Sequence, residues 1–130
     1  MTENAILVLC AAHSFGFALF HLLFWRLFDW PASLRTAGTA NRAILPIANA
    51  CLIYLFSAVG AVCLMFPQAL LHSELGRALL AGMAGFWCLR LLLQFAYLRR
   101  RHPLVQGLNV AFVLGAGLFA WPLFALAPLA

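Results

Sequence analysis

Four long apolar stretches constrain the fold of this chain more than any other feature of its sequence. Residues 5–25, 43–66 and 104–130 contain no charged residue, and residues 78–98 contain only Arg90. A helix needs about 20 apolar residues to cross the hydrocarbon core of a bilayer. Each stretch reaches that length, and the charged and turn-forming residues fall between them. The sequence therefore predicts an all-α membrane protein built as a bundle of four transmembrane helices.

The composition excludes an ordinary soluble domain. The chain is 66% hydrophobic and only 8% charged, whereas soluble domains carry about 25% charged residues. We expect a single integral membrane domain over residues 1–130, with spans at about 5–28, 42–66, 76–98 and 103–127. The first span should be permanent rather than a cleaved signal peptide, because its leader, MTEN, contains Glu3 and no basic residue.

The distribution of arginine predicts how the bundle is oriented. All eight basic residues are arginine, and six of them lie in or beside the loops at 29–41 and 99–103. The opposite side carries both termini and only Arg77. Because cytoplasmic loops are enriched in Lys and Arg, these two loops should be cytoplasmic and both termini should face outward. We expect a bacterial inner-membrane protein with this N-out, C-out topology.

The charged run Arg99, Arg100 and Arg101 suits the anionic lipid headgroups of the inner leaflet. Nucleic-acid binding is not expected, because the basic residues flank spans and no soluble domain presents them. Pairs of small residues four apart, such as Ala81 and Gly85, allow close helix packing. A bundle this small encloses little by itself, so we expect either a homo-oligomer or docking to a larger membrane partner.

Five polar residues within the expected spans lie at one depth: His21, Asn49, Arg90, Gln94 and Asn109. At about 1.5 Å rise per residue, all five lie roughly 7–14 Å from the charged cytoplasmic edge. Arg90 and Gln94 are four residues apart and therefore share a helix face. Polar groups in lipid need hydrogen-bond partners, so this layer should face the interior of the bundle.

The polar layer has a cation but no acid of its own. Arg90 is permanently charged, and no Asp or Glu lies deep in any expected span. A lipid phosphate, a carboxylate, a small anion or a quinone carbonyl would complement such a layer. We therefore expect a protein that binds or transports a small anionic or carbonyl-bearing ligand, anchored by Arg90 and oriented by the other four residues. Alternatively, Arg90 extends toward the headgroups while the neutral residues only join helices.

Two other classes of function remain open. His13 and His21 flank an aromatic segment, HSFGFALFH, and either could carry a proton or serve a redox subunit that holds haem or lies beside a quinone. The chain could instead be a structural or assembly subunit of a larger membrane complex. The identity of any cofactor is not indicated by the sequence.

Metal binding, disulfide formation and soluble-type catalysis are not expected. Cys10, Cys51, Cys63 and Cys88 all lie within spans and form no CxxC motif. Cys10, His13 and Cys63 could in principle ligate a soft metal, but their spacing is ordinary for apolar helices. Neither a nucleophile–base–acid set nor a phosphate-binding glycine loop is present, which argues against an enzyme, and a lipid-modifying enzyme with a site at the membrane edge stays an alternative.

Overall fold

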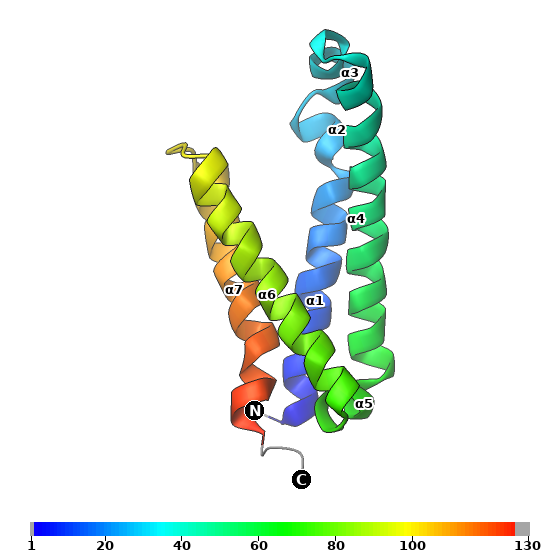
Figure 1. The fold of residues 1–130 in the computed structure, drawn as a ribbon, viewed down its shortest axis with the longest axis vertical. Helices are drawn as coiled ribbons and strands as arrows, with labels where there is room; N and C mark the ends of the chain where they lie inside the picture. Colours follow the sequence, from blue (N-terminus) through cyan, green and yellow to red (C-terminus); the bar gives the residue numbers. More distant parts are fainter. Residues whose placement is uncertain (1, 127–130) are drawn as a thin grey trace.

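The computed structural model describes residues 2–126 and consists of helices joined by short connections (Figure 1). Four helices are long and apolar enough to cross a membrane: α1 (Glu3–Leu22), α4 (Thr39–Met65), α6 (Glu74–Tyr97) and α7 (Pro103–Ala125). Shorter elements join them: α2 (Phe24–Leu27), α3 (Trp30–Ser33), the 3-10 helix η1 (Leu34–Thr36) and α5 (Pro67–His72). No strand occurs among the described residues. The all-helical fold with four long apolar helices is therefore confirmed.

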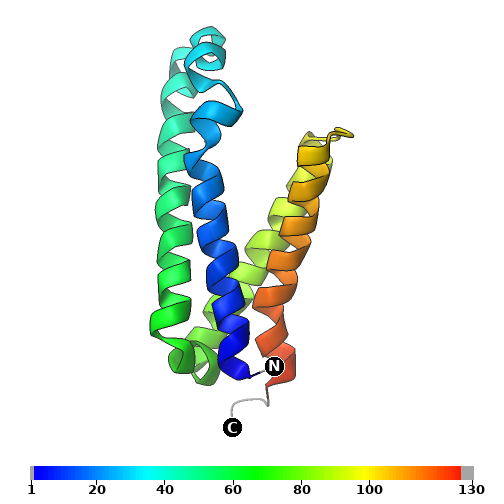
Figure 2. The ribbon, with the colours of Figure 1, turned by 180° about the vertical axis from the view of Figure 1, so that it is seen from behind.

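The long helices form two hairpins, α1 with α4 and α6 with α7 (Figure 1). The hairpins meet at the end that holds the N-terminus and α5, where α1 also contacts α5 and α7. They diverge toward the opposite end, which carries α3 on one hairpin and the connection at 98–102 on the other (Figure 2). The backbones of the two hairpins are consequently farther apart at the arginine-rich end than at the end that holds α5 (Figure 1 and Figure 2).

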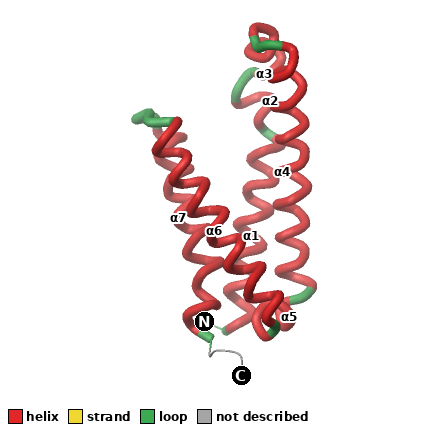
Figure 3. Tube along the Cα trace, viewed as in Figure 1, coloured by secondary structure: helices red, strands yellow, loops and turns green. Residues whose placement is uncertain are grey.

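Two segments differ from the expected boundaries. The first long helix ends at Leu22 rather than near residue 28, and the chain continues in the separate short helix α2. The expected loop at 29–41 is itself largely helical (Figure 3). Arg42 orders this segment, because its guanidinium donates to the carbonyl oxygens of Leu34 at 3.1 Å and Arg35 at 2.9 Å. These carbonyl oxygens lie outside a regular α-helix, so Arg42 gives them the hydrogen-bond donor that a continuing helix would otherwise supply.

The end that holds the N-terminus and α5, here called the closed end, is stabilised by a helix cap and a close backbone contact. The Ser73 hydroxyl oxygen caps α6 by accepting from the Gly76 N–H at 2.9 Å. Gly76 in turn packs against the backbone of Ala69 and Leu70, where a Cβ atom would clash. The absence of that atom lets α5 fold tightly against the start of α6.

An aromatic cluster joins the four long helices. Phe17 on α1, Phe56 on α4, Trp87 on α6 and Phe112 on α7 are all buried. The Trp87 ring stacks on Phe56, with centroids 5.4 Å apart and planes 12° apart, and on Phe112 at 5.9 Å and 21°. Phe17 lies 4.5 Å from Trp87. Aromatic pairs at these separations attract one another in addition to burying area, so this cluster fixes where the hairpins meet.

Candidate functional site

His21 and Asn49 form a polar pair between α1 and α4. The Asn49 amide nitrogen donates to the main-chain carbonyl oxygen of His21 at 3.0 Å. The amide oxygen of Asn49 lies 2.8 Å from Nδ1 of the His21 ring. Asn49 is therefore satisfied at both ends of its amide, and the imidazole is held in one orientation.

Arg90 and Gln94 form the second polar pair, within α6. Nη1 of Arg90 donates to Oε1 of Gln94 at 2.9 Å. The guanidinium carbon lies 4.6 Å from the centroid of the Phe112 ring, close enough for a cation–π interaction. Gln94 is only 1% exposed, whereas Arg90 is half-buried. The guanidinium thus points toward protein groups of its own hairpin and remains partly accessible.

His21 and Arg90 both line one cavity between the two hairpins, with a volume of about 310 Å³. All four long helices contribute to its walls, and α2 and Leu98 contribute at the end where the hairpins diverge. Besides His21 and Arg90, the lining residues are Phe17, Phe20, Phe24, Phe28, Leu52, Phe56, Phe86, Trp87, Leu98, Leu108 and Phe112. Arg90 is the only charged member. An apolar, aromatic cavity with a few convergent polar groups is typical of a small-molecule site.

The structure brings four of the five expected polar residues to this site. His21 and Arg90 line the cavity, and Asn49 and Gln94 support them by hydrogen bonds. Asn109 does not line the cavity, and its amide oxygen is buried without a hydrogen-bond partner among residues 2–126. The expected layer is therefore two separate pairs and one isolated amide rather than one connected network.

The aromatic walls were not recognised as part of a site from the sequence. Phenylalanine occurs in every span, so its presence alone does not distinguish a lining residue from a lipid-facing one. The segment HSFGFALFH was the one part of the sequence that indicated these walls, because its residues Phe17, Phe20 and His21 line the cavity. Which rings face them from α4, α6 and α7 depends on how the hairpins pack.

His13 makes packing contacts and one hydrogen bond between helices, and it is not among the residues that line the cavity at Arg90. Its Nε2 donates to the carbonyl oxygen of Ala111 on α7, at 2.8 Å. Its ring meets Trp87 edge-on at a centroid distance of 4.8 Å, and Gly115 lies directly against it. His13 therefore joins α1 to α7, and its ring is enclosed by side chains of three helices.

The remaining candidates lie away from the cavity. Arg99, Arg100 and Arg101 are exposed at the tip of the second hairpin, and Arg99 donates to the Phe95 carbonyl oxygen at 2.8 Å. Cys10 and Cys63 are buried, while Cys51 and Cys88 are exposed, and all four are free thiols. Across residues 2–126 no cluster of three or more His, Cys, Asp or Glu could hold a metal ion.

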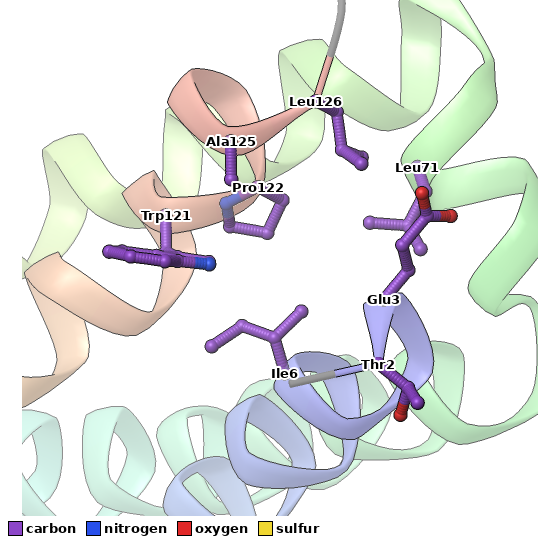
Figure 4. A pocket seen from close by; sticks show the side chains of 8 residues that line it. All are labelled: Thr2, Glu3, Ile6, Leu71, Trp121, Pro122, Ala125 and Leu126. Atoms are coloured by element: carbon purple, nitrogen blue, oxygen red, sulfur yellow. The ribbon is translucent and has the colours of Figure 1, made fainter.

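A smaller cavity of about 230 Å³ lies at the closed end of the molecule (Figure 4). It is bordered by Thr2, Glu3 and Ile6 on one side and by Trp121, Pro122 and Ala125 of α7 on the other. Its one charged residue, Glu3, is paired with His72 at 3.3 Å. This carboxylate already has a partner, so the cavity lacks the unpaired charge that distinguishes the cavity at Arg90.

These features define the class of the protein as a four-helix bundle with membrane-type helices and an aromatic cavity containing a single cation. No known protein family, curated protein or solved structure matches the chain. The function must therefore be inferred from the geometry of the site.

Proposed function

We propose that this protein binds a small anionic or carbonyl-bearing ligand in the cavity between its hairpins, with Arg90 as the anchor. The observation that carries the proposal is the unpaired charge of Arg90 in an aromatic cavity. Within the described part of the chain, the one close contact between a carboxylate and a basic side chain joins Glu3 to the His72 ring, and no carboxylate pairs with Arg90. A half-buried cation without an anion favours a negatively charged or polarised oxygen close to it.

The supporting groups position Arg90 without neutralising it. Gln94 accepts one N–H of the guanidinium, and a guanidinium has five. The Phe112 ring covers one side of the cation, which leaves its remaining donors for a ligand. A site that holds its cation with a neutral amide retains the full charge for binding.

The proposal includes a membrane orientation. With the arginine-rich ends of both hairpins on the cytoplasmic side, the end of the cavity that is lined by Phe24, Phe28 and Leu98 lies toward the inner leaflet. Arg99, Arg100 and Arg101 at the tip of the second hairpin would then lie among anionic headgroups. An anionic amphiphile would be concentrated near the cavity by the same charges. Transport of the ligand, and self-association of the bundle, are extensions of this binding function.

The test compares molecules that remain bound to purified protein in mild detergent, identified by native mass spectrometry and by extraction. The wild-type protein should carry an anionic or carbonyl-bearing molecule. Arg90→Leu should reduce its occupancy by at least about tenfold, equivalent to 1.4 kcal/mol. Arg90→Lys should retain part of it, because lysine keeps the charge but loses the planar donor geometry.

Arg77→Leu provides the matched control. Arg77 is also half-buried on α6, but it donates to the Leu123 carbonyl oxygen at the closed end of the molecule. Its loss should leave the bound molecule in place, and circular dichroism would verify that both variants are folded. Unchanged occupancy in Arg90→Leu would show that the proposal is wrong, as would a wild-type protein that carries no such molecule.

A further inference from the structure

The hydrogen bonds of Asn49 determine which nitrogen of His21 is free. The amide nitrogen of Asn49 is used by the His21 main-chain carbonyl, so the amide oxygen must accept from Nδ1–H of the ring. In the neutral imidazole Nε2 then carries a lone pair. No group among residues 2–126 makes a hydrogen bond to Nε2, and His21 lines the cavity. The first hairpin therefore offers a hydrogen-bond acceptor there.

The second hairpin, formed by α6 and α7, offers hydrogen-bond donors instead of an acceptor. Arg90 can only donate; it lines the same cavity, and its guanidinium carbon lies 4.6 Å from the ring centroid of Phe112, another lining residue. A ligand that satisfies both hairpins must present an oxygen that accepts from Arg90 and a hydroxyl that donates to Nε2 of His21. A simple carboxylate or a quinone meets only the first requirement, because neither has a hydroxyl hydrogen.

The cavity walls favour a planar head group. The rings of Phe56, Trp87 and Phe112 are nearly parallel, with interplanar angles of 12° and 21°. His21 itself stacks on Phe24, at a centroid distance of 4.3 Å and an angle of 27°. Because these three rings pack on one another, they leave no space between them and instead form one aromatic wall of the cavity, against which a flat aromatic ring can pack.

An apolar groove of about 390 Å³ adjoins the cavity between α1 and α7. Phe17, Phe20 and Leu108 line both the groove and the cavity. The groove is further lined by Gly16, Pro103, Leu104, Gly107 and Ala111. A Cβ atom added at Gly16 or Gly107 would meet no atom within 4 Å, so the two glycines leave open space. An apolar tail attached to a head group in the cavity has room there.

We propose that the ligand is an amphiphile with a hydroxyl-bearing planar ring, bound between Arg90 and His21, and an apolar tail in the groove at Gly16 and Gly107. This inference rests on the proposed function and narrows its ligand class. Burial of the tail supplies affinity in proportion to its area, while the two polar contacts orient the ring.

The head group is tested with a redox-inert pair, decyl para-hydroxybenzoate and decyl para-methoxybenzoate, titrated by calorimetry into nanodiscs with and without the protein. Both compounds have the planar ring, the carbonyl and the tail, but only the first has the hydroxyl donor. The hydroxy compound should bind at least about tenfold more tightly to the wild type. The double variant His21→Phe/Asn49→Leu removes both polar partners together, so it should fold and should bind the two compounds equally.

The tail is tested with Gly107→Leu, which adds a side chain at the wall of the groove, at a position where its Cβ atom would meet nothing within 4 Å. This variant should bind decyl para-hydroxybenzoate at least about tenfold more weakly than the wild type, and methyl para-hydroxybenzoate with unchanged affinity. Gly117→Leu is the matched control on α7, because Gly117 also has open space around it but does not line the groove. It should bind both compounds as the wild type does.

The outcomes separate this inference from the proposed function. Equal binding of the hydroxy and methoxy compounds by the wild type, or undiminished binding of the decyl compound by Gly107→Leu, would overturn the inference. If Arg90→Leu still weakens the binding of both compounds in that case, the proposed function is supported and only the inference fails. If Arg90→Leu binds both compounds like the wild type, both proposals fail. Absence of any binding above empty nanodiscs would also overturn the inference, and the retained-molecule experiment would then decide the proposed function.

Discussion

Asn49 holds His21 through two hydrogen bonds, one to the ring Nδ1 and one to the main-chain carbonyl oxygen, at 2.8 and 3.0 Å. The two residues lie on different helices and are 28 positions apart in the sequence. Their pairing fixes the register of α1 against α4 and the orientation of the imidazole at the same time. The Arg90–Gln94 pair differs, because it lies within one helix and orients a side chain without joining helices.

Replacing Asn49 by alanine should destabilise the first hairpin. The change removes both hydrogen bonds and leaves the His21 carbonyl and ring nitrogen without their partner. Since hydrogen bonds between membrane helices contribute about 0.6 kcal/mol on average, we expect a loss of about 1–2 kcal/mol. Denaturation in mixed micelles, followed by circular dichroism, would measure it. Asn41→Ala is the control, because Asn41 is exposed and makes no side-chain hydrogen bond with residues 2–126; an equal effect of both changes would contradict the role of Asn49.

Replacing Gln94 by glutamate should abolish binding at Arg90 while preserving the fold. Glutamate has nearly the same shape, and its carboxylate can accept the same Arg90 hydrogen bond. It also neutralises the cation, so an anionic or carbonyl oxygen loses its electrostatic advantage. We expect the occupancy of the retained molecule to fall by at least about tenfold, measured by native mass spectrometry.

The matched control for this variant is Gln106→Glu. Gln106 is exposed on α7 and does not line the cavity, so the same added charge there should leave occupancy unchanged. Full retention of the bound molecule by Gln94→Glu would mean that the charge of Arg90 is not what holds it.

Replacing Gly115 by alanine should weaken the contact between the hairpins. A Cβ atom at this position would lie 2.6 Å from Cε1 of His13 and 2.8 Å from Cγ of Trp87. Trp87 is only 1% exposed and cannot move aside easily. Overpacking of this kind costs about 1–3 kcal/mol. Gly117→Ala, two residues further along α7 with open space around it, should be nearly neutral in the same unfolding measurement.

The proposed topology can be tested with reporter fusions. Alkaline phosphatase is active only outside the cytoplasm, so a fusion after Ala130 should be active if the C-terminus faces outward. A fusion after Arg101 should be inactive, because that connection is expected on the cytoplasmic side. The opposite pattern of activities would show that the orientation is reversed and that the end of the cavity lined by Phe24, Phe28 and Leu98 lies at the outer leaflet.

The sequence by itself was sufficient to predict the four long helices, but not the short helices between them. Each long helix satisfies its own backbone hydrogen bonds, so its existence depends on a local run of apolar residues and on nearby breakers. Pro67 and Pro103 begin helices as expected for proline in a first turn, and Ser73 caps α6. The boundary near residue 28 was missed because the segment after Leu22 remains apolar while the helix is interrupted.

The polar residues of the site were also visible in the sequence, since an arginine in an apolar helix is conspicuous and the depth of its neighbours follows from the helical rise. Which of these residues form hydrogen bonds with one another could not be predicted from the sequence. Asn49 pairs with His21 and Asn109 with no described residue, although both amides were expected at the same depth. Rotation about each helix axis decides which residues meet, and the weak periodicity of uniformly apolar helices does not specify that rotation.

Only the tertiary structure decided that there is a cavity and what lines it. The angle between the hairpins depends on close contacts between residues far apart in the sequence, such as Gly115 against His13 and Trp87. That angle determines whether Phe56 and Phe112 pack together or form walls around a space that Arg90 and His21 share. The sequence thus determined which long helices form, because helix formation in an apolar chain is local, whereas the site required the packing of side chains far apart in the chain.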